Sequence, residues 1–236
     1  METKLIENLF GEKIDAYLPD GHICHTILRD PAFGFERPVK EFIQKWVIPG
    51  MGFIDVGAHA GLFSLYAMNL MQPVGSILGF EPSPDLAKLC RENLSWQGKQ
   101  VSWHIVEAAA WNTEDRLKIA YNRGDNEGDN RVTNMPDESS DGWEFTTCIG
   151  TAVDTVVKRV WSGLRTSVFL KIDAQWAEVE VLEGSKYTLD HCIAGVVEIQ
   201  NETRSTVVHI LEKAGFLITD LGPDIGFYRR GMAEVS

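Results

Sequence analysis

From about residue 50 onward, short runs of β-branched and aromatic residues alternate with longer segments that have helical periodicity. This alternation is typical of β-α-β crossover units, in which parallel strands form one sheet and helices cover it. The pattern therefore predicts an α/β fold with a twisted, mainly parallel sheet and helices on both faces.

The expected elements follow one another closely along this part of the chain. Expected strands cover residues 53–56, 76–80, 101–106, 168–172 and 194–199, and expected helices cover residues 62–70, 84–96, 179–189 and 205–214. Residues 216–219 and 226–228 are expected to form a C-terminal antiparallel hairpin, since such a pair often completes an otherwise parallel sheet.

Two segments do not fit this alternation. Residues 1–48 are expected to be an N-terminal extension that packs on the core, and Phe42–Ile48 within it is expected to be a helix on the sheet edge. Residues 121–142 contain six acidic residues, two arginines and few apolar ones, so an acidic flexible insertion is expected there, either solvated surface or a lid over the substrate. The length favours a single domain over residues 1–236.

Charge and cysteine usage restrict the classes of partner. The chain has 22 Lys and Arg against 34 Asp and Glu, a net charge of -12, which disfavours binding to nucleic acid and to membrane surfaces. The N-terminus lacks the apolar stretch of a signal peptide, and no apolar run is long enough to span a membrane. Four scattered cysteines, Cys24, Cys90, Cys148 and Cys192, suit a reducing compartment. We expect a cytoplasmic location.

The strongest motif is Asp55-Val56-Gly57-Ala58-His59-Ala60-Gly61, between an expected strand and an expected helix. Gly57 and Gly61 allow a tight turn and close approach of a ligand, with Ala58 between them. The G-x-G-x-x-G spacing of a phosphate cradle is missing, and Asp55 would repel a pyrophosphate but accept hydrogen bonds from a cationic amino group. The motif therefore predicts that this turn binds a sulfonium amino-acid nucleoside. The alternative is that Asp55 only caps the following helix and that the two glycines only allow the helix to pack against the strand.

Two further acids end the next two expected strands. Glu81, followed by Pro82, is in position to bind both ribose hydroxyls, as the corresponding acid does in dinucleotide folds. Glu107 is a candidate for the adenine amino group, and the stretch that begins at Ala108 would supply an apolar or stacking surface.

The candidate catalytic groups lie further along the chain. Asp173 and Glu198 end two neighbouring expected strands, on the side where open α/β sheets bind ligands. Together with Asn201 they would either hydrogen-bond the acceptor or hold a magnesium ion. His59 is a second candidate base, although a structural role is the alternative. Asp173 has an alternative role too, as the N-cap of a helix that begins near Trp176.

Elsewhere, no metal site is predicted. His22, Cys24 and His25 lie close together, but no second pair of ligands follows, so an exposed turn is expected there.

Four motifs, in this order and spacing, resemble the FkbM family of class I S-adenosylmethionine-dependent methyltransferases. They are DVGAHAGLFSLYA (55–67), GFEPSP (79–84), EAAAWN (107–112) and KIDAQWAEVEVLEGS (171–185). The resemblance runs from about Pro38 to about Tyr228. It implies a Rossmann-like class I fold, S-adenosylmethionine as cofactor, and methylation of a hydroxyl oxygen on a small metabolite, sugar, lipid or natural product.

The resemblance also implies roles for individual residues. Asp55, Gly57, Gly61 and Glu81 would bind the cofactor. Asp173 and Glu178 would match two acids of the family's K-x-D-x-E-G-x-E signature.

The chain departs from that signature, because its middle acid and glycine are replaced by Gln175 and Trp176. Trp176 would either fill core volume or wall the acceptor pocket. The main hypothesis is an O-methyltransferase with a small hydroxylated acceptor. The alternatives are a catalytically inactive binding protein of the same fold and a nicotinamide-dependent oxidoreductase.

Overall fold

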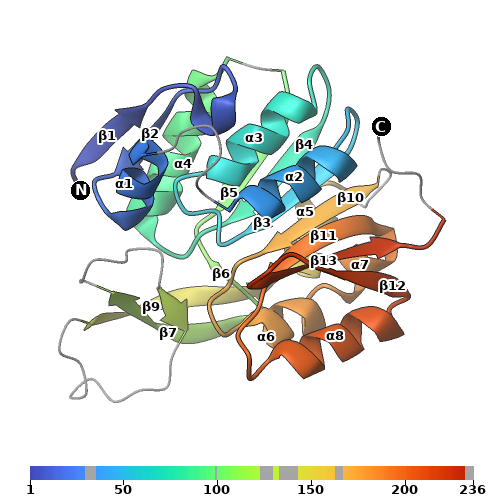
Figure 1. Ribbon diagram of the computed structural model, residues 1–236. Helices are drawn as coiled ribbons and strands as arrows, with labels where there is room; N and C mark the ends of the chain where they lie inside the picture. Colours follow the sequence, from blue (N-terminus) through green and yellow to red (C-terminus); the bar gives the residue numbers. More distant parts are fainter. Residues whose placement is uncertain (30–35, 99, 123–129, 133–142, 163–166, 232–236) are drawn as a thin grey trace.

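The structure is a computed structural model that describes residues 1–29, 36–98, 100–122, 130–132, 143–162 and 167–231. A seven-stranded sheet runs through its centre, and helices lie on both faces of that sheet (Figure 1). This arrangement confirms the predicted α/β class.

The strand order in this sheet is β12-β13-β11-β10-β3-β4-β5. Neighbours from β11 to β5 pair in parallel, whereas β13 is antiparallel to both β11 and β12, which confirms the closing hairpin. The strands are β3 (Gly52–Val56), β4 (Ser76–Phe80), β5 (Ser102–Val106), β10 (Val168–Ile172), β11 (Cys192–Glu198), β12 (Phe216–Asp220) and β13 (Asp224–Arg229).

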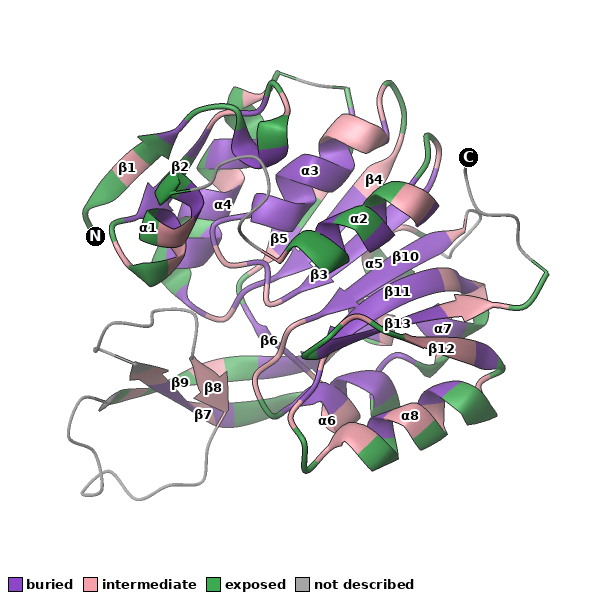
Figure 2. Cartoon of the chain, viewed as in Figure 1, coloured by how far each residue is buried: buried purple, intermediate pink, exposed green. Residues whose placement is uncertain are grey.

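Two hydrophobic clusters, one on each face, attach the helices to the sheet. Helix α3 is buried at every position from Leu62 to Met68, as the purple ribbon in Figure 2 shows, because it is apolar around most of its circumference. No helix in the described ranges is long and apolar enough to cross a bilayer. The first face carries α2 (Arg37–Trp46), α3 (Leu62–Leu70) and α4 (Pro84–Trp96), and the second carries α5 (Val153–Val160), α6 (Glu178–Glu183), α7 (Lys186–His191) and α8 (Arg204–Lys213).

Helix α2 packs on a face of the sheet, so the prediction that it would lie on an edge was wrong. The ring centroids of Phe42 and Phe169, on β10, are 6.2 Å apart, and Trp46 stacks on Tyr228, on β13, at 5.3 Å. These rings bury apolar surface over the middle of the sheet, which the narrower edge would not cover.

The prediction of one helix over residues 179–189 was also wrong, because this segment forms two separate helices, α6 and α7. A Cβ on Gly184 would lie 2.0 Å from the carbonyl oxygen of Trp111, so the chain passes too close to its neighbour here for any side chain. Asp154 then caps α7 by accepting hydrogen bonds from the amides of Tyr187 and Thr188 at 2.7 and 2.8 Å.

The N-terminal segment contributes directly to the first cluster. It forms β1 (Thr3–Ile6), the 3-10 helix η1 (Leu9–Gly11), β2 (Ala16–Pro19) and α1 (His22–Arg29). Phe10 stacks on Phe63 of α3, with ring centroids 5.4 Å apart. Cys24 is buried within α1, so the exposed turn expected around it is a helix.

A second, four-stranded sheet with the order β6-β9-β7-β8 was not predicted. The strands are β6 (Ala109–Trp111), β7 (Asp115–Asn122), β8 (Arg131–Val132) and β9 (Trp143–Ala152). Most of the predicted insertion 121–142 lies outside the described residues; within it, β7 ends at Asn122 and residues 130–132 are described. The division into one domain with this insertion stays a prediction.

Candidate functional site

A cavity lies at the carboxyl ends of β3, β4 and β10, where open α/β sheets bind ligands. The end of β3 and the turn that follows it contribute residues 55–59, and the segments after β4 and β10 contribute Glu81, Pro82 and Asp173. The fold thus brings together Asp55, Gly57, Ala58, His59, Glu81, Pro82 and Asp173 from the predicted site.

Backbone contacts fix the turn after β3. Gly57 has a φ of 75°, and a Cβ there would lie 1.9 Å from the carbonyl oxygen of Asp173, so only glycine fits between the two segments. The amides of Gly57 and Ala58 both donate to the carbonyl of Phe80 at 3.0 Å. The turn is therefore held against β4 on one side and against the end of β10 on the other.

Gly61 meets a different constraint. Its φ is 89°, and a Cβ on it would lie 2.8 Å from Sγ of Cys90 on α4. It does not line the cavity. Close packing of α3 against α4 therefore accounts for this glycine in the structure.

Glu81 is held rigidly at the tip of β4. Its Oε2 accepts a hydrogen bond from the amide of His59 and its Oε1 accepts one from the amide of Ser83, both at 2.9 Å. Burial raises the pKa of Glu81 to about 7, although these two bonds favour the charged form. The carboxyl group thus lies ready at the cavity wall and titrates near neutrality.

Asp55 is 1% exposed, and only one of its two carboxylate oxygens accepts a side-chain hydrogen bond from the described residues. Its Oδ2 accepts a hydrogen bond of 2.7 Å from Ser64, whereas its buried Oδ1 has no hydrogen-bond donor among the described residues. Burial raises the pKa of Asp55, although Lys171 and Ser64 oppose the shift. This oxygen can accept a hydrogen bond from a cationic ligand.

Lys171 is a site residue that the sequence reasoning missed. Its Nζ lies 3.7 Å from Oδ1 of Asp55, 3.2 Å from Oδ2 of Asp173 and 5.1 Å from the ring centroid of Phe63. Burial lowers its pKa, but the negative charges of Asp173, Asp55 and Glu36 more than reverse that effect and raise it. A lone charged residue within the apolar strand VFLKI was the signal, because a buried lysine needs a carboxylate partner.

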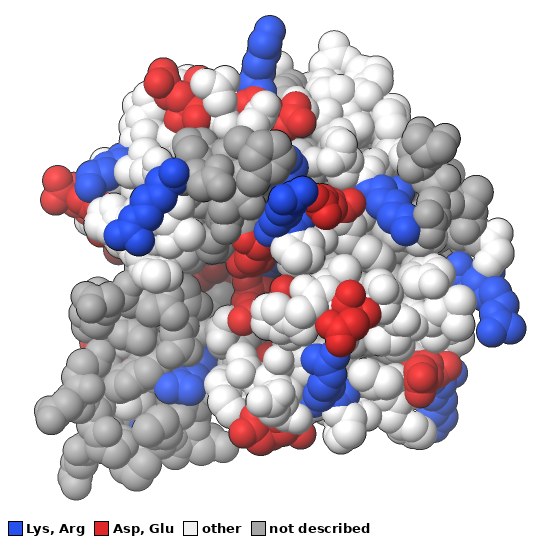
Figure 3. All heavy atoms as spheres, viewed as in Figure 1, with Lys and Arg blue, Asp and Glu red and all other residues white. Residues whose placement is uncertain are grey.

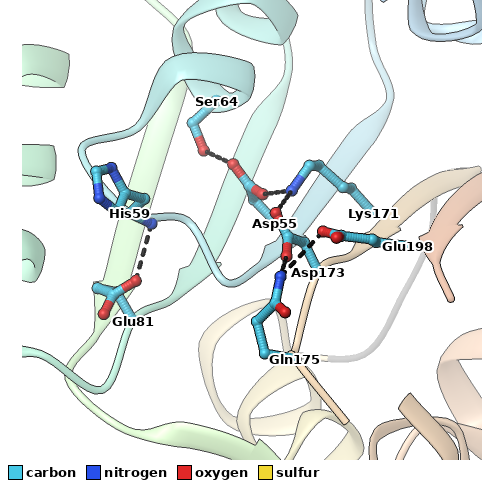
Figure 4. Close-up of polar contacts among 8 residues, drawn as sticks. All are labelled: Asp55, His59, Ser64, Glu81, Lys171, Asp173, Gln175 and Glu198. Atoms are coloured by element: carbon cyan, nitrogen blue, oxygen red, sulfur yellow. Dashed lines mark hydrogen bonds and ion pairs between the residues drawn. The ribbon is translucent and has the colours of Figure 1, made fainter. Parts of the chain in front are cut away.

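Asp173, Gln175 and Glu198 form a hydrogen-bonded group (Figure 4). Nε2 of Gln175 donates to Oδ1 of Asp173 and to Oε2 of Glu198, both at 3.1 Å. Burial alone raises the pKa of Asp173, but Lys171 and hydrogen bonds from Glu198 and Gln175 hold it below its usual value. The charge of Asp173, then burial, raises the pKa of Glu198 to about 9. The pair therefore retains one proton at neutral pH.

Asp173 does not act as the N-cap of the following helix. Helix α6 begins at Glu178 after Ala177, and no side chain caps it. Glu178 is buried and accepts hydrogen bonds from the amide of Trp176 at 2.8 Å and from Oγ1 of Thr203 at 3.2 Å. Trp176 is 41% exposed, so it does not fill core volume.

Several predicted residues do not line the cavity: Gly61, Glu107, Ala108, Glu178 and Glu198. Glu107 points to the surface, where its Oε2 lies 3.5 Å from Nη1 of Arg91. Ala109 and Ala110, just beyond Ala108, do line the cavity, so the apolar wall expected from this stretch begins one residue later.

Residues from distant segments complete the wall. Glu36, at the start of α2, and Arg131, on β8, both line the cavity. Burial raises the pKa of Glu36 to about 8, helped by the charges of Asp173, Asp224 and Asp55. No sequence motif marks these residues, because only the tertiary fold brings them to the site.

Acidic groups outnumber basic ones at this site. Acidic atoms, coloured red in Figure 3, gather in a hollow near the centre of the face shown. Within the described part of the chain, no group of three or more His, Cys, Asp or Glu side chains is arranged to hold a metal ion.

Comparison with known proteins agrees with this geometry. The methyltransferase FkbM domain matches residues 55–218, which is more than half of the chain. A solved FkbM methyltransferase from Methylobacillus flagellatus KT is 12% identical and superposes with a TM-score of 0.52. The match covers 75% of this chain but only 43% of that protein, so the chain spans less than half of its length.

Two more solved structures match this chain with lower TM-scores. Precorrin-6y C5,15-methyltransferase from Geobacter metallireducens GS-15 is 13% identical, with a TM-score of 0.49 over 82% of this chain and 87% of that one. The tRNA (uracil-54, C5)-methyltransferase of Pyrococcus abyssi, solved with S-adenosyl-L-homocysteine, is 9% identical, with a TM-score of 0.48 over 96% and 43%.

The domain match spans the glycine turn, Glu81 and the KIDAQWAE segment, which are the segments that the fold assembles around the cavity. The chain therefore belongs to the FkbM family of class I S-adenosylmethionine-dependent methyltransferases.

Proposed function

We propose that this chain binds S-adenosylmethionine in the cavity and transfers its methyl group to a hydroxyl oxygen of a small molecule. The observation that carries the proposal is the convergence of Asp55, Glu81 and Asp173 around the turn at Gly57. Three carboxyl groups at the tips of three adjacent strands suit a ligand that carries an ammonium group, a sulfonium and two ribose hydroxyls.

Each half of the cofactor has a suitable partner. Oδ1 of Asp55 accepts no hydrogen bond from the described residues, although Nζ of Lys171 lies 3.7 Å away, and it is the acceptor for a cationic amino group. The rigidly held Glu81 suits the ribose hydroxyls. The apolar side chains of Leu86, Ala109 and Ala110 suit the adenine ring. Glu107 has no part in this arrangement, since it lies outside the cavity wall.

Asp173 is the group we assign to the acceptor. When bound, the cofactor supplies an electrophilic methyl carbon, and the acceptor oxygen forms its new bond to that carbon as the carbon–sulfur bond breaks. The attacking hydroxyl becomes strongly acidic during this step, so even a weakly basic carboxylate takes up its proton. Asp173 is such a carboxylate, because Lys171 keeps it ionised. His59 remains the alternative base, since it also lines the cavity.

The charge of the site guides the choice of acceptor. The acidic wall disfavours phosphorylated acceptors and nucleic acid, and the net charge of -12 disfavours anionic membrane surfaces. A small neutral or cationic molecule with a hydroxyl group fits best. A reducing, cytoplasmic location agrees with four cysteines that are all free, three of them buried.

The test is methyl transfer from radiolabelled S-adenosylmethionine to fractions of a cell extract. The proposal expects label in the small-molecule fraction that survives mild alkali, since ethers are stable to alkali and methyl esters are not. Asp173→Asn should lower the turnover far more than the cofactor affinity. Label in RNA or protein would refute the acceptor class. If the chain binds S-adenosylmethionine but labels no fraction of the extract, the result would favour the alternative of a catalytically inactive binding protein.

A further inference from the structure

Gln175 lies between two acidic side chains from neighbouring strands. Asp173 follows β10 and Glu198 ends β11, and Nε2 of Gln175 is 3.1 Å from an oxygen of each (Figure 4). Both partners are carboxyl groups, so the nitrogen of the amide and not its oxygen faces them. One side chain thus bridges the two acids by donating hydrogen bonds.

Two carboxyl groups that lie within hydrogen-bond distance of one nitrogen are stabilised by a cation or a hydrogen-bond donor between them. Divalent cations often fill such a position, because they prefer carboxylate and carbonyl oxygens as ligands. Here the amide places N–H groups where a bridging cation would lie. Lys171, 3.2 Å from the other oxygen of Asp173, supplies the balancing positive charge from the opposite side.

The backbone is bent to bring the amide to this position. Gln175 and Trp176 have φ values of 41° and 78°, which non-glycine residues rarely adopt and which the surrounding structure must hold in place. The buried Glu178 holds this conformation by accepting the amide of Trp176 at 2.8 Å. The amide bridge is therefore a built feature of the loop.

We propose that Gln175 is a positioning residue that takes the place of a bridging cation between Asp173 and Glu198, so that this chain transfers methyl groups without a divalent metal. The inference rests on the proposed function, in which Asp173 receives the proton of the acceptor hydroxyl. Gln175 and Lys171 hold this carboxylate, and the electron pair of the broken carbon–sulfur bond stays on sulfur.

The test uses Mn²⁺ alone as the probe, followed by electron paramagnetic resonance in a titration of the full chain. The wild-type chain should show no saturable site at millimolar Mn²⁺. Gln175→Glu should gain a saturable site, because a third carboxylate then replaces the hydrogen-bond donor. Its affinity for Mn²⁺ should exceed the weak binding of the wild type by about tenfold or more. Adding Glu198→Gln to this variant should remove the gained site. Gln100→Glu is the matched control, since it adds the same charge on the exposed segment before β5 and should bind no Mn²⁺.

A second variant covers the case in which Gln175→Glu does not fold. Gln175→Met keeps the length of the side chain but donates no hydrogen bond, so it too should bind Mn²⁺ several-fold more tightly than the wild type. A saturable Mn²⁺ site in the wild type that Asp173→Asn abolishes would overturn the inference. So would folded Gln175 variants that gain no affinity.

Binding of S-adenosylhomocysteine separates this inference from the proposed function. If the wild type binds no adenosyl compound, the proposed function fails, while the Mn²⁺ titrations still decide the role of Gln175. If cofactor binding is intact and the wild type needs Mn²⁺ or Mg²⁺ to label its acceptor, the inference alone fails.

Discussion

Replacing Lys171 by Met would leave the buried Asp55 and the half-buried Asp173 without their shared cation. The side chain of Lys171 is 4% exposed, and its Nζ lies 3.2 Å from Asp173 and 3.7 Å from Asp55. At an effective dielectric constant of about 20, these two attractions amount to roughly 5 and roughly 4.5 kcal/mol. The cost of burying the ammonium offsets a large part, so removing one partner of such a pair costs about 3–5 kcal/mol.

An independent estimate comes from protonation. If one aspartate escapes its unpaired charge by binding a proton, the cost at pH 7 is roughly 4 kcal/mol, since its ordinary pKa is about 3.9. At pH 5 the same cost falls to roughly 1.5 kcal/mol. The destabilisation by Lys171→Met should therefore shrink by more than half between pH 7 and pH 5.

The assay is urea unfolding of the wild type and Lys171→Met at both pH values, followed by circular dichroism. Lys171→Met combined with Asp55→Asn is the matched control, because it removes one charge of each sign and should recover most of the loss. A loss that is equal at pH 5 and pH 7, or one below about 1 kcal/mol, would refute the electrostatic reasoning. The lysine would then contribute only through packing.

Three further changes test the fold and the site. Gly57→Ala should cost about 2 kcal/mol or more beyond the cost of Gly50→Ala in urea unfolding, because both glycines have positive φ but only Gly57 lies against a backbone oxygen. Equal losses would contradict the close approach. Asp154→Ala should lower the free energy of unfolding by about 1–3 kcal/mol, since it leaves the amides of Tyr187 and Thr188 without their acceptor. An unchanged free energy of unfolding would contradict the role of Asp154 as the cap of α7. The pKa of Glu198 is raised to about 9 in the folded protein, so its contribution to stability is present below its unfolded pKa and is lost as the pH rises to about 9. Glu198→Gln should thus flatten the fall in the free energy of unfolding between pH 5 and pH 9, and parallel profiles would argue against this pKa.

The central sheet was predictable because its strands are apolar on both sides and are separated by well-marked helices. The strands expected at 76–80 and 168–172 have the bounds that the structure gives them. The small second sheet was not predictable in this way. Strand β9 has a glutamate and three threonines among its apolar residues, and its described positions are largely exposed or half-buried, so it lacks the continuous apolar run of a core strand.

Some residues of the site were predictable from the sequence and others were not. Asp55, Glu81 and Asp173 follow strands, so their common edge could be inferred from local pattern alone. Glu36 and Arg131 reach the cavity only through tertiary packing, which no spacing in the sequence encodes. Lys171 lies between these cases, because its place in a buried strand marked it as unusual but did not identify its two partners.

Calorimetric titration with S-adenosylhomocysteine tests the central claim most directly. We predict one binding site per chain for this compound and no binding of NAD, with Glu81→Gln weakening the affinity by about 1–3 kcal/mol because buried hydroxyl partners are left poorly paired. No heat with the adenosyl compound, or an affinity that Glu81→Gln leaves unchanged, would contradict the assignment of this cavity to the cofactor.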